Sequence, residues 1–440
     1  MTPATAGPYS PADPSEPWPV RRAFPLLATL GLILIGMGGT IWGPVYYHET
    51  AWAVPDDLWA TLVAAQRMLH LDLAGLYTPP TNLVSFPGTA LILVPVAALI
   101  DAAGLPLKTG ADIQLRAGSQ IGNHAEWLIL GPCVVILSAV VLFAADALAE
   151  RMAVSQFKRF LLAAAGATAL WNVTIRWGHP EDAVAVGLLL YAVLAVSNGK
   201  PVRAAWLAGA AVAVQPLVLL AFPFLLVTIE PRRLAGFVAR AVVPTLVLLG
   251  SAAAANWTAT VHAVTSQPNA PTVDHPTPWI YLTALAPHLS NGSVAAGPAR
   301  ALSIVVACAC ALATWRRWRP ARLGDWSPQI LQELLWWVAF ALALRTFFEP
   351  VMVSYYVWPP LAAALVAASP SYLRLLPTGV TAGVLTFLSQ SSWRNPFLWW
   401  TPMVAVLGLT LLFAWPRGAR SVAAQVQPEP GEQFVTDSAP

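Results

Sequence analysis

Charged side chains are scarce in this sequence. Lys and Arg number 24 and Asp and Glu number 21, so only 10% of the 440 residues are charged, against about 25% in an ordinary soluble domain. This scarcity excludes a water-soluble fold. The net charge of +3, spread over many loops, also argues against a nucleic-acid partner.

Cysteine is rare as well. The chain has three, Cys133, Cys308 and Cys310, an odd number, and all of them lie in apolar runs. We therefore expect small, buried hydrophobic side chains at these positions, rather than a disulfide or a metal site.

Long apolar runs are abundant instead. Hydrophobic residues make up 57% of the chain, and the mean hydropathy is +0.62. Runs of roughly membrane-spanning length lie near residues 23–43, 87–104, 127–148, 160–175, 182–197, 203–213, 216–229, 235–255, 299–315, 330–346, 351–369, 376–390 and 396–415. They predict an all-α fold, a polytopic transmembrane helical bundle of about 11 to 13 spans.

The chain divides into three predicted parts. Residues 1–22 are a disordered N-terminus, residues 23–416 a transmembrane domain and residues 417–440 a disordered tail. Arg21 and Arg22 precede the first apolar run and predict a cytoplasmic N-terminus in the plasma membrane, with residues 43–86 outside. No cleavable signal peptide is expected, because the run is long for one.

The basic loops do not all agree on one topology. From Arg151 onward they alternate consistently with the spans. Counted from the N-terminus, residues 105–126 lie inside; counted back from the C-terminus, they lie outside. Either a candidate span within residues 87–148 is broken, re-entrant or misplaced, or the basic loop at Arg151 violates the rule.

The first outer loop carries two adjacent acids, Asp56 and Asp57, preceded by His48 and Glu49. Apolar residues recur at helical spacing over residues 58–69 and predict an interfacial amphipathic helix. One aspartate suits the N-cap of this helix. The other is then free to accept a proton or to bind a cation.

A second polar group separates two apolar runs. It contains His179, Glu181 and Asp182, and Gln215 ends a later run. Pro180 suits a first helical turn, where the two acids would complement the helix dipole, and this alone could explain them. It does not explain His179, so we favour a binding role. Zinc ligation is disfavoured, because no second His or Cys follows at helical spacing.

A third group surrounds Arg345. Glu349 follows at i+4 and could simply pair with it. An arginine near aromatic side chains at a membrane boundary could also hold a lipid phosphate, and Arg67 in the first outer loop is a second candidate. Tyr355 and Tyr356 are either part of this site or of an ordinary interfacial aromatic belt.

The order of these features resembles the GT-C glycosyltransferases that use polyprenyl-phosphate sugars, in particular the actinobacterial integral-membrane mannosyltransferases. The resemblance covers roughly residues 21–368. It rests on the acids Asp56-Asp57, a Leu-Tyr element before Phe86-Pro87, the polar turn at residues 177–182, the small-residue run ending in Gln215-Pro216, and the Tyr356 to Pro359-Pro360 element. The family's polar turn has Gln and Asn where this chain has His179 and Glu181.

The resemblance implies an inverting hexosyltransferase, with mannose the favoured sugar. Asp56 or Asp57 would act as the base and the remaining polar residues would bind a polyprenyl-phosphate-linked donor. The acceptor would be a lipid or a cell-envelope glycan on the outer face. No cofactor is expected, although a divalent metal is compatible. The alternative is a proton-coupled transporter, or a polyprenyl-lipid flippase or binding protein without transferase activity.

Overall fold

The structure is a computed structural model. It describes residues 16–47, 56–79, 81, 83, 85–105, 124–266, 271, 274–285, 294, 297–390 and 396–416. These residues are mostly helical, and their one sheet joins two short strands, β1 (His275–Pro276) and β2 (Val351–Met352). The prediction of a helical bundle whose apolar helices could cross a membrane is confirmed at this level.

Within the described residues, four helical stretches are long and apolar enough to cross a membrane. They are α7 (His124–Ser138) together with α8 (Val140–Arg151), α10 (Pro180–Ser197), α13 (Pro231–Ala255) and α17 (Pro328–Phe348). A fifth arises if α15 (Gly297–Ala313) is counted with the segment that follows it after a 60° bend. That segment consists of η4 (Trp315–Trp318) and α16 (Arg319–Arg322).

Further helices fill the rest of the bundle. They are α2 (Ala23–Tyr47), α9 (Gln156–Trp171), α11 (Pro201–Val214), η2 (Pro216–Ala221), α12 (Phe222–Leu226), α18 (Trp358–Ala368), α19 (Tyr372–Leu388) and α20 (Pro396–Ala414). Every run predicted from the sequence thus contains helix. The predicted disordered N-terminus also contains a short helix, α1 (Trp18–Arg21), while residues 1–15 and 417–440 lie outside the described part.

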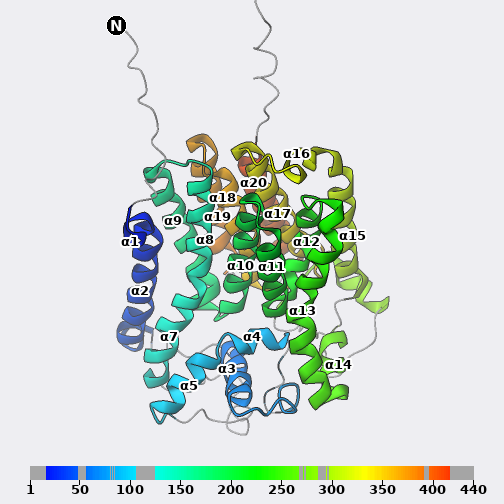
Figure 1. Ribbon diagram of the computed structural model, residues 1–440. Coiled ribbons are helices and arrows are strands. Elements are labelled where there is room, and N and C mark those ends of the chain that lie inside the picture. The colour runs from blue at the N-terminus through cyan, green and yellow to red at the C-terminus, as the bar shows by residue number, and fades with distance from the viewer. Residues whose placement is uncertain are drawn as a thin grey trace, which may run out of the picture.

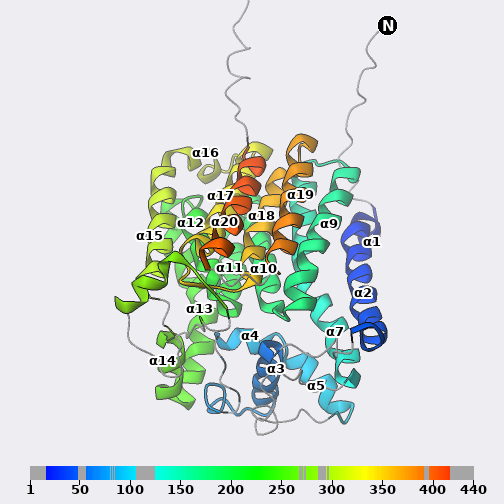
Figure 2. The ribbon, with the colours of Figure 1, turned by 180° about the vertical axis from the view of Figure 1, so that it is seen from behind.

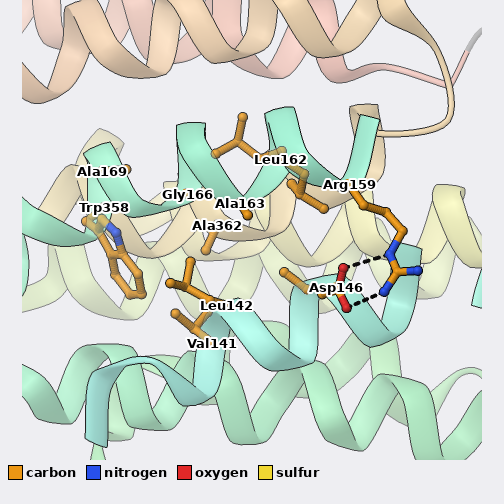
Figure 3. A pocket seen from close by; sticks show the side chains of 12 residues that line it. Val141, Leu142, Asp146, Arg159, Leu162, Ala163, Gly166, Ala169, Trp358 and Ala362 are labelled. Carbon is orange, nitrogen blue, oxygen red and sulfur yellow. Dashed lines mark hydrogen bonds and ion pairs between the residues drawn. The ribbon is translucent and has the colours of Figure 1, made fainter. Parts of the chain in front are cut away.

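An ion network fixes the N-terminal arginines at one end of the bundle. Arg22 contacts Asp146 at 2.8 Å, and Arg21 contacts Glu150 at 2.7 Å. Arg159 also binds Asp146, with N–O distances of 2.6 and 2.7 Å, beside a narrow pocket between α8, α9 and α18 (Figure 3). The N-terminal basic pair therefore lies on the same side as the basic region around Arg159, as the positive-inside pattern requires.

The opposite end of the bundle holds α3 (Asp56–Leu69), α4 (Pro87–Leu91), α5 (Val94–Ala102) and α14 (Trp257–Ser266) (Figures 1 and 2). The predicted span at residues 87–104 is not one straight helix, because it breaks between α4 and α5 at Ile92 and Leu93. Both pieces stay at this end beside α3. A broken segment within residues 87–148 was one of the alternatives that the sequence left open for the conflict in topology.

The amphipathic helix predicted over residues 58–69 is confirmed as α3. An interfacial helix would expose its apolar face to lipid, but the apolar face of α3 is covered by protein. Leu58, Leu62 and Ala65 are buried, and α3 packs on α4 and α5. The hydroxyl of Thr89 in α4 donates to the carbonyl oxygen of Val214 at 2.6 Å, at the end of α11. This layer is therefore tied to the bundle at the break that follows α11.

The cysteines are all free thiols. Cys133 and Cys310 are half-buried, but Cys308 is exposed on α15. The expectation that all three are buried is wrong for Cys308, because α15 lies at the edge of the bundle (Figure 1).

Candidate functional site

Polar side chains from four parts of the chain converge at the end that carries α3. The contributing segments are the start of α3, the start of α10, the end of α17 with η5 (Ser354–Val357), and the residue before β1. They bring together Asp57, His179, Glu181, Asp182, Asp274, Arg345 and Tyr355.

His179 owes its position to an irregular connection between α9 and α10. The last turn of α9 widens into a π-helical turn, η1 (Asn172–Arg176), and Gly178 then adopts a φ of +69°, which favours glycine. The backbone N–H of His179 donates to the carbonyl of Val173 at 2.8 Å. Pro180 begins α10, with Glu181 and Asp182 in its first turn, as predicted.

The imidazole of His179 lies between two carboxylates. Its Nδ1 is 2.6 Å from Oε1 of Glu181, and its Nε2 is 3.3 Å from Oδ2 of Asp57. The ring stacks on Tyr355 with a centroid distance of 3.8 Å. The pairing with Asp57 joins the first outer loop to the polar turn, the two groups singled out most strongly from the sequence.

The electrostatic interactions in the cluster favour the charged forms of His179 and Asp57. Burial lowers the pKa of His179, but the negative charges of Glu181 and Asp57 outweigh it and raise the pKa to about 10. The contact with the charged His179 lowers the pKa of Asp57 below its usual value. Because 68% of the Asp57 side chain is exposed, it is an ionised carboxylate that remains open to a ligand.

Asp274 is a site residue that sequence reasoning did not single out. It directly precedes β1, which pairs with β2 just after Glu349 and Pro350. Burial and the nearby charge of Asp57 raise its pKa to about 6. No local motif surrounds Asp274, and only the long-range pairing of β1 with β2 brings it here.

Asp182 lies deeper than the other acids. It is fully buried, and Gln215 donates to its Oδ1 at 2.7 Å from the break between α11 and η2. Its Oδ2 has no hydrogen-bond partner among the described residues. Arg345 interacts electrostatically with this carboxylate, so the predicted set of Asp182, Gln215 and Arg345 is brought together.

Arg345 is held by an aromatic ring and by a shared acid. Its guanidinium lies 3.5 Å from the ring centroid of Tyr356, and its Nε is 3.6 Å from Oε2 of Glu349. Glu349 also forms a closer ion pair with Arg300 of α15, which sequence reasoning missed. The i, i+4 pair therefore exists, but it is part of a larger network in which Glu349 is shared with Arg300.

Some predicted residues are not part of this cluster. Arg67 lies near the far end of α3 and pairs with Asp72 at 2.8 Å. The backbone of Asp56 begins α3, but its side chain lies outside the described residues, as do His48 and Glu49. Of the two candidate bases, Asp57 is the one whose surroundings are described.

The cluster combines the open carboxylate of Asp57 with the buried imidazolium of His179 and the half-buried guanidinium of Arg345. Asp57 can accept a proton, His179 keeps it ionised, and Arg345 supplies positive charge for an anion. No group of three His, Cys, Asp or Glu side chains that could hold a metal ion occurs among the described residues. No protein-family model matches the chain, and a search of curated proteins found no match.

Proposed function

We propose that this protein is an integral-membrane glycosyltransferase that takes a hexose, mannose favoured, from a polyprenyl-phosphate donor. The acceptor is a hydroxyl of a lipid or a cell-envelope glycan. The observation that carries this proposal is the ion pair of the open Asp57 carboxylate with the buried His179, with Arg345 interacting electrostatically with the nearby Asp182. The resemblance of the sequence to GT-C enzymes supplies the reaction class.

In this reaction Asp57 removes the proton from the acceptor hydroxyl as its oxygen attacks the anomeric carbon. The bond between that carbon and the phosphate oxygen breaks, and polyprenyl phosphate leaves with the bonding electrons. The leaving group is a stabilised anion, so the reaction needs one positioned base and nearby cations. Asp57 supplies the first, and Arg345 is the cation we assign to the phosphate.

An apolar groove supports a lipid-linked donor. It has a volume of about 550 Å³ and is lined by α2, α9 and α19, including Phe24, Ile35, Trp171 and Phe387. Trp171 directly precedes η1, whose first residue accepts a hydrogen bond from Gln390 at the end of α19. A polyprenyl chain in this groove would lead its phosphate towards the site.

The proposed orientation follows from charge. The arginine-rich end of the bundle faces the cytoplasm by the positive-inside rule, so the site faces outward from the plasma membrane. Donor and acceptor would both reach Asp57 from the outer leaflet. A Cys substituted for the exposed Arg176 beside the site should react with an impermeant thiol reagent from outside the cell.

The direct test is sugar transfer from a labelled polyprenyl-phosphate donor by purified protein. Asp57→Asn should lower the rate by roughly 10² to 10⁴, because a general base contributes this much. Asp72→Asn is the matched control, since it removes an exposed acid of the same loop that pairs with Arg67. Equal loss in both variants, or none in either, would refute the role of Asp57.

A transporter is the second candidate, and one observation favours it. Asp182 is fully buried with one oxygen unpartnered among the described residues, and it faces the break between α11 and η2 through Gln215. Buried acids at broken helices are typical of ion-coupled carriers. Proton-driven solute uptake by proteoliposomes that is lost in Asp182→Asn, without any sugar transfer by wild type, would select this alternative.

A further inference from the structure

The arginine-rich end of the bundle carries an unusual surface segment that the proposed reaction does not use. After α15 the chain bends by 60° into η4 and α16. The segment reads Trp-Arg-Arg-Trp-Arg-Pro-Ala-Arg over residues 315–322, with four arginines and no acid. Because of the bend it runs across the end of the bundle instead of continuing along it (Figure 1).

Part of the segment is anchored to the protein. Trp318 is buried, and its indole N–H donates to the hydroxyl of Thr314 at 3.2 Å. Arg322 stacks on Trp315 and donates to the carbonyl of Val227 at 2.8 Å, next to the end of α12. These contacts hold the segment in one conformation, so its remaining side chains are presented in a fixed arrangement.

Two of the arginines are left without such contacts. Arg316 and Arg319 are exposed, and neither guanidinium group forms an ion pair or hydrogen bond with another described residue. Arg317, in contrast, pairs with Glu333 at 2.9 Å. Exposed apolar side chains flank the pair, with Leu312 74% and Leu323 77% exposed.

We propose that this segment binds the head group of an anionic phospholipid. The free guanidinium groups of Arg316 and Arg319 match a phosphate, to which arginine can donate two hydrogen bonds at once. Leu312 and Leu323 enter the acyl region beside it, as expected of an amphipathic segment at a membrane interface. Clusters of basic residues next to a membrane span attract anionic lipids in this way.

The test compares the binding of fluorescent short-chain phosphatidylglycerol and phosphatidylcholine to the full-length protein in a neutral detergent. Wild type should prefer phosphatidylglycerol, and Arg316→Gln with Arg319→Gln should weaken its binding by roughly tenfold or more. Lys200→Gln with Arg203→Gln is the matched control. It removes the same charge from exposed positions on a different basic turn and should retain the preference.

Three outcomes would overturn the proposal. Wild type could bind both lipids equally, which would exclude an anionic-lipid site. Both double variants could lose the preference equally, which would show a general charge effect in place of a site at this segment. The arginine variant could also keep the preference, which would place the anionic-lipid site elsewhere on the protein.

Discussion

His179 is the residue on which the proposed site depends most. It is buried, and it pairs with Glu181 on one side and Asp57 on the other, while its ring stacks on Tyr355. A buried imidazole ring between two carboxylates is favourable only while the ring is protonated. Its protonation therefore links the start of α3 to the start of α10.

The raised pKa of His179 predicts a pH dependence of stability. A group whose pKa rises from 6.5 in the unfolded chain to about 10 in the folded protein stabilises the fold fully below pH 6.5. That contribution is lost as the pH rises through about 10. The difference in Tm between wild type and His179→Gln should be largest below pH 6.5 and disappear above pH 10, as thermal unfolding in detergent can measure.

A control variant separates this effect from general alkaline damage. His262→Gln removes a histidine from α14 that takes no part in the cluster, and its Tm should follow wild type across the same range. A constant difference between His179→Gln and wild type from pH 6 to 11 would mean that His179 is neutral in the folded protein.

Among the elements, α3 needs a firm attachment to place Asp57. The attachment runs through α4, where Thr89 donates to Val214 and Gly88 lies so close to Ala213 that a β-carbon would clash with its carbonyl oxygen. Thr89→Val should destabilise the protein by about 1 kcal/mol and also lower the transfer rate. Thr78→Val, which removes a hydrogen bond within the outer loop, should leave the rate nearly unchanged.

At the other end, the buried acid of α8 holds two arginines from different elements. Asp146→Asn removes the partner of Arg159, which is only 4% exposed, and weakens the contact with Arg22. Breaking such a pair should cost about 3 to 5 kcal/mol of stability. Glu333→Gln breaks the exposed pair with Arg317 and should cost about 1 kcal/mol or less. Equal costs in the two variants would contradict the burial that the structure assigns to Asp146.

The basic segments and the candidate site lie at opposite ends of the molecule. Arg21, Arg22 and the η4–α16 segment lie at one end, and the cluster around Asp57 lies at the other (Figures 1 and 2). The sequence predicted this polarity well, because apolar runs and basic loops are local features. Charged residues beside apolar runs are conspicuous, and Asp57, His179 and Arg345, singled out for this reason, lie in one cluster in the structure.

What the sequence could not predict depends on contacts between distant residues. Asp274 and Arg300 reach the cluster only through the pairing of β1 with β2 and the packing of α15 on α17. Arg67 looked equivalent to Arg345 as a phosphate ligand, yet its side chain pairs locally with Asp72. The broken segment at residues 87–104 is apolar throughout most of its length, so hydropathy could not separate it from a true span.

In the proposed reaction, the acceptor oxygen displaces polyprenyl phosphate from the anomeric carbon in a single step, with Asp57 as the base. The stereochemistry of the product tests it most directly. Purified wild-type protein would be given an isotopically labelled polyprenyl-phosphate sugar and an acceptor, and the anomeric configuration of the new glycoside determined by NMR. We expect a product inverted relative to the donor, and its loss in Asp57→Asn. A product with retained configuration, or no product from a donor that the protein binds, would contradict it.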